Sequence, residues 1–304
     1  MEKVIIVGGA TASGKSDFAL KLAKAINSEI ISADSMQIYR NMNVGTAKIM
    51  PSEMEGITHH MLDVIDASES YSVSNYVDEV RPIITRLNNE GKVPIIVGGT
   101  GLYIDALIYD FEFNNAEIDY EYRHELENLA KVHGNEYVHN MLKELDSEEA
   151  NKIHPNNIKR VIRALEICKT TGGKKVENKK TLRYDVLMFV IDTDRELLYD
   201  RINRRVDIMI NNGLEEEIRG LIERGITFDT QSMQAIGYKE WNGYIDGNAS
   251  IDEVSEAIKK NSRNYAKRQI TWFYNKYRDI AKFVHLDEID KAINITKEFC
   301  NLEK

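Results

Sequence analysis

Eight residues near the amino terminus can bind phosphate groups. They match GxxxxGK[ST], a nucleotide-binding motif in which main-chain N–H groups surround phosphate oxygens. In this pattern Lys15 can reach an outer phosphate, and the Ser16 hydroxyl can ligate Mg²⁺. The motif consists of Gly9, Ala10, Thr11, Ala12, Ser13, Gly14, Lys15 and Ser16. The motif predicts a phosphate site, but it does not identify the compound that carries the phosphate.

The flanking sequence supplies the elements that such a loop needs. An apolar run at 4–7 predicts a buried strand, and Phe18, Leu22 and Ile26 form one apolar stripe of a helix. Further apolar runs at 30–32, 93–97 and 186–191 alternate with segments of helical periodicity. This pattern predicts an α/β fold, a P-loop NTPase-like parallel sheet with flanking helices. After residue 191 we expect only helices and turns.

The middle of the chain has a different character. Strand signals vanish between residues 114 and 183, where the sequence becomes charged and helix-forming. We therefore expect a mostly helical insertion at 114–183 within a catalytic core formed by 1–113 and 184–304.

Composition limits the class of protein. The 304 residues contain no apolar run long enough to span a membrane, and the start lacks a secretory leader. The expectation is a cytoplasmic protein without a membrane partner. Cys168 and Cys300 have neither CxxC spacing nor a nearby histidine pattern, so we expect reduced, structural cysteines.

The net charge of −9 argues against a nucleic-acid partner, but the charges are unevenly distributed. Residues 159–183 hold nine Lys or Arg against two Glu, and residues 259–278 hold seven and no acid. Aromatic residues such as Tyr265 and Trp272 interleave the second stretch. Two interpretations stay open, a solvated charged face and a surface for a polyanion.

Residues that directly follow strands are candidates for chemistry, because ligands bind beyond the carboxyl ends of parallel strands. Asp34 follows the strand at 30–32 and could accept a proton or hold Mg²⁺ through water. A turn-capping role is an equal alternative. Gly98 to Gly101 follow the strand at 93–97, where a P-loop ATPase has an Asp for Mg²⁺. That difference disfavours an ATPase.

Basic and histidine residues form two further groups. Arg201 and Arg205 lie four apart on one helix face beside Arg204, and could clamp a phosphate leaving group. Surface ion pairs with neighbouring acids are an equal alternative. His59 and His60 are interpreted as a loop or packing pair rather than a metal site.

Seven ordered segments together closely resemble the tRNA dimethylallyltransferases, also called tRNA isopentenyltransferases. They occupy 9–16, 32–39, 44–48, 96–103, 160–166, 234–240 and 266–273. The resemblance runs from residue 4 to about residue 274. Ala10 and Thr58 stand where the family commonly has Pro, which affects only the expected geometry of those loops.

The resemblance implies a reaction. Such enzymes transfer a dimethylallyl group from dimethylallyl diphosphate to N6 of adenosine 37, in tRNAs that read codons beginning with U. The phosphate loop would then hold the donor's diphosphate with Mg²⁺, and Lys15 and Arg205 would neutralise its charge. Asp34 matches the family's general base.

The resemblance also implies the acceptor site. Asp34, Thr100, Ser35, Met36 and Gln37 match positions that contact the target nucleotide. A segment of Lys159, Arg160, Val161, Ile162 and Arg163 matches a tRNA contact, so the insertion would close on the anticodon stem-loop.

A monomer is expected. Two other enzymes stay open, a P-loop small-molecule or nucleotide kinase and an adenylate prenyltransferase. The long insertion and the basic stretches favour tRNA over a free nucleotide. A non-catalytic RNA-binding module would need neither Lys15 nor Asp34.

Overall fold

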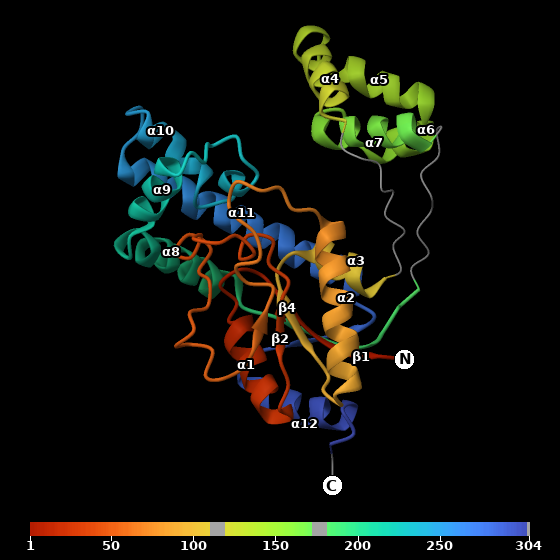
Figure 1. Ribbon diagram of the computed structural model, residues 1–304, viewed down its shortest axis with the longest axis vertical. Coiled ribbons are helices and arrows are strands. Elements are labelled where there is room, and N and C mark those ends of the chain that lie inside the picture. Colours follow the sequence, from red (N-terminus) through yellow and green to blue (C-terminus); the bar gives the residue numbers. More distant parts are fainter. Residues whose placement is uncertain (110–118, 172–180, 303–304) are drawn as a thin grey trace. The chain divides into compact units, whose positions relative to one another are not determined.

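The computed structural model describes residues 1–109, 119–171 and 181–302 (Figure 1). The chain divides into two compact units, residues 1–109 with 181–304 and residues 110–180. The expected insertion boundary at residue 114 and residues 174–180 of the first basic stretch lie outside the described residues. Among the helices that are described, none combines the length and the apolar character that a bilayer crossing requires.

The larger unit is built on a six-stranded sheet whose neighbouring strands are all parallel. Its spatial order is β3-β2-β4-β1-β5-β6. The strands are β1 (Lys3–Gly9), β2 (Ile30–Ser32), β3 (His59–His60), β4 (Ile95–Gly98), β5 (Asp185–Ile191) and β6 (Ala281–Val284). The central strand β1 lies between β4 and β5, so the phosphate loop leaves the middle of the sheet. The predicted α/β class is confirmed.

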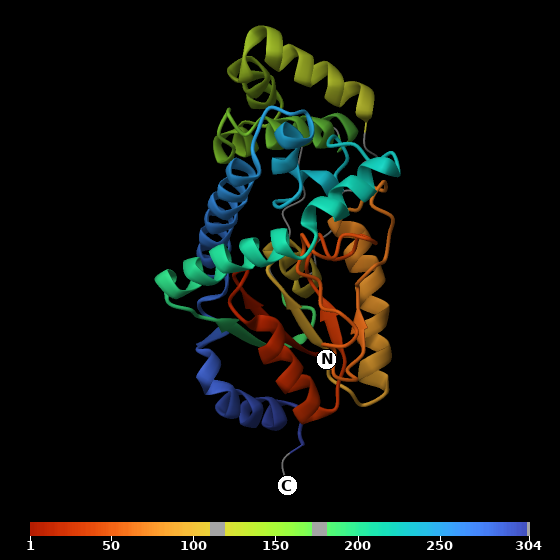
Figure 2. The same cartoon turned by 90° about the vertical axis from the view of Figure 1, so that its left-hand side faces the viewer.

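The helices of this unit cover both faces of the sheet. They are α1 (Lys15–Ile26), α2 (Val73–Asn89), α3 (Gly101–Ile108), α8 (Arg195–Asn211), α9 (Leu214–Glu223), α10 (Asn242–Ile245), α11 (Ile251–Tyr277) and α12 (Ile289–Phe299). Short 3₁₀ turns are η1 (Ser232–Gln234), η2 (Lys239–Trp241) and η3 (Leu286–Glu288). Helices α1 and α12 lie side by side, and the long helix α11 contacts α8 (Figure 2).

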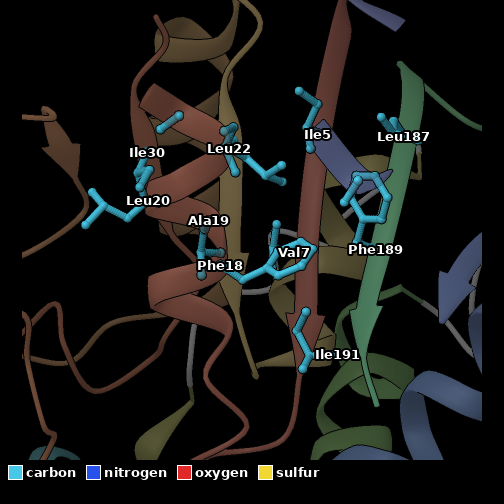
Figure 3. Packing of buried hydrophobic residues seen from close by; sticks show 14 of the residues in the cluster. Ile5, Val7, Phe18, Ala19, Leu20, Leu22, Ile30, Leu187, Phe189 and Ile191 are labelled. Atoms are coloured by element: carbon cyan, nitrogen blue, oxygen red, sulfur yellow. The ribbon is translucent and has the colours of Figure 1, made fainter. Parts of the chain in front are cut away.

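Strand alternation places the apolar core against α1. Ile5 and Val7 point to the same face as Phe189, and Phe18 and Leu22 of α1 pack onto them (Figure 3). The Phe18 and Phe189 rings meet edge to face with centroids 6.0 Å apart. The apolar stripe predicted for this helix is therefore buried against the sheet, and it fixes the helix that starts at the phosphate loop.

On the opposite face, α11 lies very close to β1. A Cβ atom at Gly8 would lie 2.4 Å from the Phe273 ring of α11. The ring of Tyr76 on α2 stacks on Tyr103 of α3, with centroids 4.2 Å apart. The stacked rings hold α3, which begins at the carboxyl end of β4, against α2.

The expectation of only helices and turns after residue 191 is wrong, because β6 adds an edge strand. Met188 pairs with Ala281 and Ile191 with Val284. The segment has four residues and directly follows a 27-residue helix, so its alternation is too brief to predict a strand. Strand β3 is shorter still, at two residues.

The two histidines of β3 have packing and pairing roles, and the half-buried carboxylate of Glu29 holds His60. His60 Nε2 lies 2.7 Å from Glu29 Oε2, and Glu29 also accepts from Lys92 and Arg86. Burial acts against this charge, but the three hydrogen bonds lower the pKa of Glu29 to about 2. These bonds connect β3 to the residue that directly precedes β2, and Asp34 lies two residues after the end of β2.

Replacing Glu29 with glutamine should destabilise the fold. A folded-state pKa depressed from 4.5 to about 2 stabilises the protein above pH 4.5, and this stability is lost as the pH falls toward 2. Glu29→Gln should lower the free energy of unfolding at pH 7 by up to about 3 kcal/mol. Urea unfolding at pH 7 and pH 4 measures this change.

Glu90→Gln is the matched control, since Glu90 pairs with the same Arg86 but is 41% exposed. Its effect should stay below about 1 kcal/mol. Equal losses in both variants would contradict the proposed importance of the Glu29 cluster.

The smaller unit consists of helices, as predicted for the middle of the chain. They are α4 (Tyr120–His133), α5 (Asn135–Leu145), α6 (Ser147–Lys152) and α7 (Ile158–Thr171). Leu126, Val138 and Leu165 are fully buried in its own apolar core. Tyr109 and Leu182 bridge each other in the larger unit, so the chain leaves and re-enters that unit at one point.

Candidate functional site

The phosphate loop connects β1 to α1 with a backbone that suits an anion. Gly14 caps α1 in the left-handed region at φ 89°, and Ala12 adopts φ 61°, which is uncommon for a residue with a side chain. Gly14 therefore meets a conformational requirement of the motif. The first turn of α1 leaves N–H groups without intrahelical acceptors, and these groups attract phosphate oxygens.

Lys15 is half-buried at this helix start. Its Nζ donates to Ala10 O at 3.1 Å, which folds the side chain back over the loop. Burial lowers the pKa of Lys15 to about 8, with the negative charge of Asp34 acting against this shift and Arg205 acting with it. Lys15 therefore remains mainly protonated at neutral pH, and it lies close to both groups.

A cavity of about 1040 Å³ opens beside the loop. Its walls include Lys15, Ser16, Asp34 and Gln37 from the amino-terminal half of the chain, and Arg205 from α8. The structure thus brings together residues that lie up to 190 positions apart. This arrangement could not be derived from spacing, because it depends on how α8 crosses the carboxyl edge of the sheet.

Two neighbouring arginines of α8 differ in their surroundings. Arg204 is 75% exposed and pairs with Asp200, as the ion-pair alternative predicts. Arg205 is instead half-buried, and desolvation lowers the pKa of its guanidinium, while Asp17 and Asp34 act in the opposite direction. Within the described ranges Arg205 forms no ion pair. A half-buried cation without a carboxylate partner is suited to bind an anionic ligand.

Asp34 caps a turn and also lines the large cavity. Its Oδ1 accepts from the Met36 N–H at 2.9 Å, so it does cap a turn. Its carboxylate also lines the large cavity and acts electrostatically on Lys15 and Arg205. A carboxylate whose orientation is fixed by a turn, and which lines the same cavity as two half-buried cations, can keep a defined direction toward a substrate.

The other predicted acceptor residues lie close to Asp34. Thr100 Oγ1 accepts from the Ser35 N–H at 3.2 Å, and Gln37 Nε2 donates to Thr46 O at 3.3 Å. Ser35, Met36 and Thr100 are half-buried but are not part of the wall of the large cavity. Of the predicted nucleotide contacts, Asp34 and Gln37 face this cavity directly.

Sequence reasoning assigned no individual role to two residues that hold backbone groups at the cavity wall. Glu217 of α9 accepts from the N–H groups of Asn43, Val44 and Gly45 at 2.6, 2.8 and 3.0 Å. Buried Lys48 donates to Tyr39 O at 2.7 Å. Both side chains line the cavity. Lys48 belongs to the segment 44–48, which resembles the family. No pattern in the sequence indicates a role for Glu217.

Tyr265 of α11 is a third missed residue. Burial raises its pKa to about 12, and the charge of Asp34 adds to this shift. The sequence identified Tyr265 only as an aromatic residue within a basic stretch, but the structure places it beside the predicted base.

The predicted basic surfaces are partly exposed. In the helical unit, Lys159 and Arg160 face solvent, while Val161 and Ile162 are buried in its core. Arg163 pairs with Glu166 at 3.0 Å. The side chains of Val161 and Ile162 therefore pack inside the helical unit and are not exposed to a ligand. On α11, Lys267 and Arg268 are exposed.

A metal ion would need ligands from a substrate at this site. Among the described residues, no group of three or more His, Cys, Asp or Glu side chains could hold a metal. Ser16 lines the cavity together with Asp17 and Asp34. Mg²⁺ commonly uses few protein oxygens together with substrate phosphates and water, so this donor set suits Mg²⁺ bound with a diphosphate.

Comparisons with known proteins agree on one family. A family model described as IPP transferase matches residues 37–276. A tRNA dimethylallyltransferase of Bacillus mycoides is 52% identical over 281 residues, covering 90% of this chain and 88% of the relative. One of Bacillus cytotoxicus is 51% identical over 286 residues, covering 93% and 90%.

Solved structures give the same result over the full length. The tRNA isopentenylpyrophosphate transferase of Bacillus halodurans has a TM-score of 0.75 and 44% identity, covering 99% of this chain and 98% of its own. A eukaryotic dimethylallyltransferase acting on tRNA has a TM-score of 0.86 and 30% identity, covering 100% and 81%. The resemblance seen in the sequence is confirmed, and the chain belongs to the IPP transferase family.

Proposed function

We propose that this enzyme transfers a dimethylallyl group from dimethylallyl diphosphate to N6 of adenosine 37, in tRNAs that read codons beginning with U. The products are N6-(dimethylallyl)adenosine and diphosphate. The observation that carries the proposal is one cavity lined by Lys15, Arg205 and Asp34, a phosphate-binding pair facing a candidate base. Family membership supports the prenyl-transfer reaction on tRNA.

The phosphate side of the cavity would stabilise the leaving group. As the bond between C1 of the donor and its diphosphate oxygen breaks, negative charge grows on the diphosphate. Lys15, the N–H groups of the loop and Arg205 would bind that charge, and partly buried charged groups interact more strongly than fully exposed ones because water screens them less. The hydroxyl of Ser16 would hold Mg²⁺, which supplies further charge neutralisation when bound.

The acceptor side would activate adenine. The N6 lone pair is conjugated with the ring, so the amino group is a weak nucleophile. We assign Asp34 as the base that takes the N6 proton as the bond from N6 to C1 forms. Gln37, Ser35, Met36 and Thr100 would position the base. It would have to leave the anticodon-loop stack first, a step made easier in a single-stranded loop.

Exposed basic residues would bind the tRNA backbone. Lys159 and Arg160 of the helical unit, with Lys267 and Arg268 of α11, offer positive side chains despite the net charge of −9. We propose that the helical unit contacts the anticodon stem-loop. We further propose that the protein acts as a monomer in the cytoplasm, where its tRNA substrates are.

Mass spectrometry of unmodified tRNA tests the proposal directly. Incubation with the protein, Mg²⁺ and dimethylallyl diphosphate should add one dimethylallyl group to adenosine 37 and release diphosphate. ATP turnover without prenyl transfer would instead identify a P-loop kinase. Prenylation of free adenylate but not of tRNA would identify an adenylate prenyltransferase.

A further inference from the structure

A buried glutamine joins the two loops that carry the site. Gln269 lies on α11 and is 6% exposed. Its Nε2 donates to Gly99 O at 2.9 Å, and its Oε1 accepts from the Thr11 N–H at 2.9 Å. One amide therefore bonds both the phosphate loop and the glycine-rich loop after β4.

The contact geometry admits only one arrangement. A Cβ atom at Gly99 would lie 2.1 Å from Nε2 of Gln269, so the glycine allows this close approach. The amide cannot be reversed, because its N–H groups would then face the Thr11 N–H and its oxygen would face Gly99 O. Gln269 thus holds the spacing between the loops as well as their orientation.

The glycine-rich loop continues this link to the acceptor residues. Gly99 precedes Thr100, whose Oγ1 accepts from the Ser35 N–H, and Ser35 follows Asp34. The phosphate loop is therefore connected to the residues around the candidate base by the hydrogen bonds of Gln269 and Thr100, together with the peptide bonds that join Gly99 to Thr100 and Asp34 to Ser35.

We propose that Gln269 is a positioning residue that couples donor binding to acceptor binding; this inference rests on the proposed function. A diphosphate that orders the phosphate loop would also order the loop of Thr100 through Gln269. The RNA would then bind a protein that is already ordered, and the converse would hold equally. The ligands should therefore strengthen each other's binding.

Equilibrium binding measures this coupling in the full-length protein. The donor probe is dimethylallyl thiolodiphosphate, which is not transferred, and the acceptor probe is an unmodified anticodon stem-loop RNA. In the wild type, saturating RNA should lower the Kd of the donor probe on the order of tenfold. In Gln269→Met, which keeps the side-chain length and removes both hydrogen bonds, the ratio of the two Kd values should fall to near one.

Gln231→Met is the matched control. The Gln231 amide also bridges one backbone N–H and one backbone C=O, those of Tyr71, at 3.1 and 2.8 Å. It lies outside the large cavity, so this variant should keep the coupling. Equal loss of coupling in Gln231→Met would overturn the proposal, since the effect would then be a general loss of stability.

Gln269→Glu provides a second variant if the methionine form does not fold. The carboxylate can still accept from the Thr11 N–H, but it repels Gly99 O, so coupling should again be lost. Coupling that persists in a folded Gln269 variant, or that does not exist in the wild type, would overturn the inference. Wild-type protein that binds neither probe would instead overturn the proposed function.

Discussion

Asp34→Asn is expected to slow prenyl transfer on the order of 10²–10⁴-fold, while the Kd for tRNA changes little. Asparagine keeps an oxygen that can accept from the Met36 N–H, so the turn should survive. It cannot take the N6 proton, so the chemical step should be affected rather than binding. Single-turnover kinetics with enzyme in excess over tRNA measures that step directly.

Asp66→Asn is a control with the same local geometry. Asp66 Oδ1 accepts from the Ser68 N–H at 3.0 Å, two residues on, as Asp34 does from Met36. Because Asp66 lies outside the cavity wall, its replacement should leave the transfer rate within about twofold of the wild type. A normal rate for Asp34→Asn would assign the base to another residue.

Arg205→Ala is expected to reduce kcat/KM for the donor on the order of 10²–10³-fold without destabilising the unliganded protein. The loss follows because the guanidinium would bind the charge that grows on the leaving diphosphate. Stability should persist because Arg205 forms no ion pair among the described residues, so its removal leaves no carboxylate unpaired. Donor kinetics and thermal unfolding measure the two effects separately.

Arg195→Ala serves as the control on the same helix. Arg195 is exposed and its guanidinium lies 5.3 Å from the centre of the Tyr199 ring, outside the cavity wall. It should change donor kinetics by less than about twofold. If Arg205→Ala lowered the unfolding temperature and left donor kinetics unchanged, Arg205 would be a structural residue.

The sequence predicted the parts of the fold whose patterns are local. Four strands, β1, β2, β4 and β5, lie where the sequence has apolar runs. Helix α1 lies where the sequence has an apolar stripe that includes Phe18 and Leu22. Strands β3 and β6 were not predicted, because two and four residues are too few to show an alternating pattern. Their stability comes from neighbours, as the hydrogen bonds of Glu29 with His60 and Lys92 illustrate.

The site could be predicted only in part, for a related reason. Lys15 and Asp34 follow strand ends, where position alone indicates a role. Gln269 and Glu217 act through backbone groups of segments far away in the sequence, and such bonds leave no spacing pattern. Arg205 could not be separated from Arg204 until α8 was seen to bury one partly and expose the other.

The long reach of Gln269 has a consequence for synthesis of the chain on the ribosome. Its bonds to Thr11 and Gly99 span 258 and 170 positions, and Glu217 reaches Asn43 across 174. A nascent chain that ends before α11 already contains the whole phosphate motif but not the amide that fixes it. Such contacts form late, so the two halves of the site can reach their final spacing only near the end of translation.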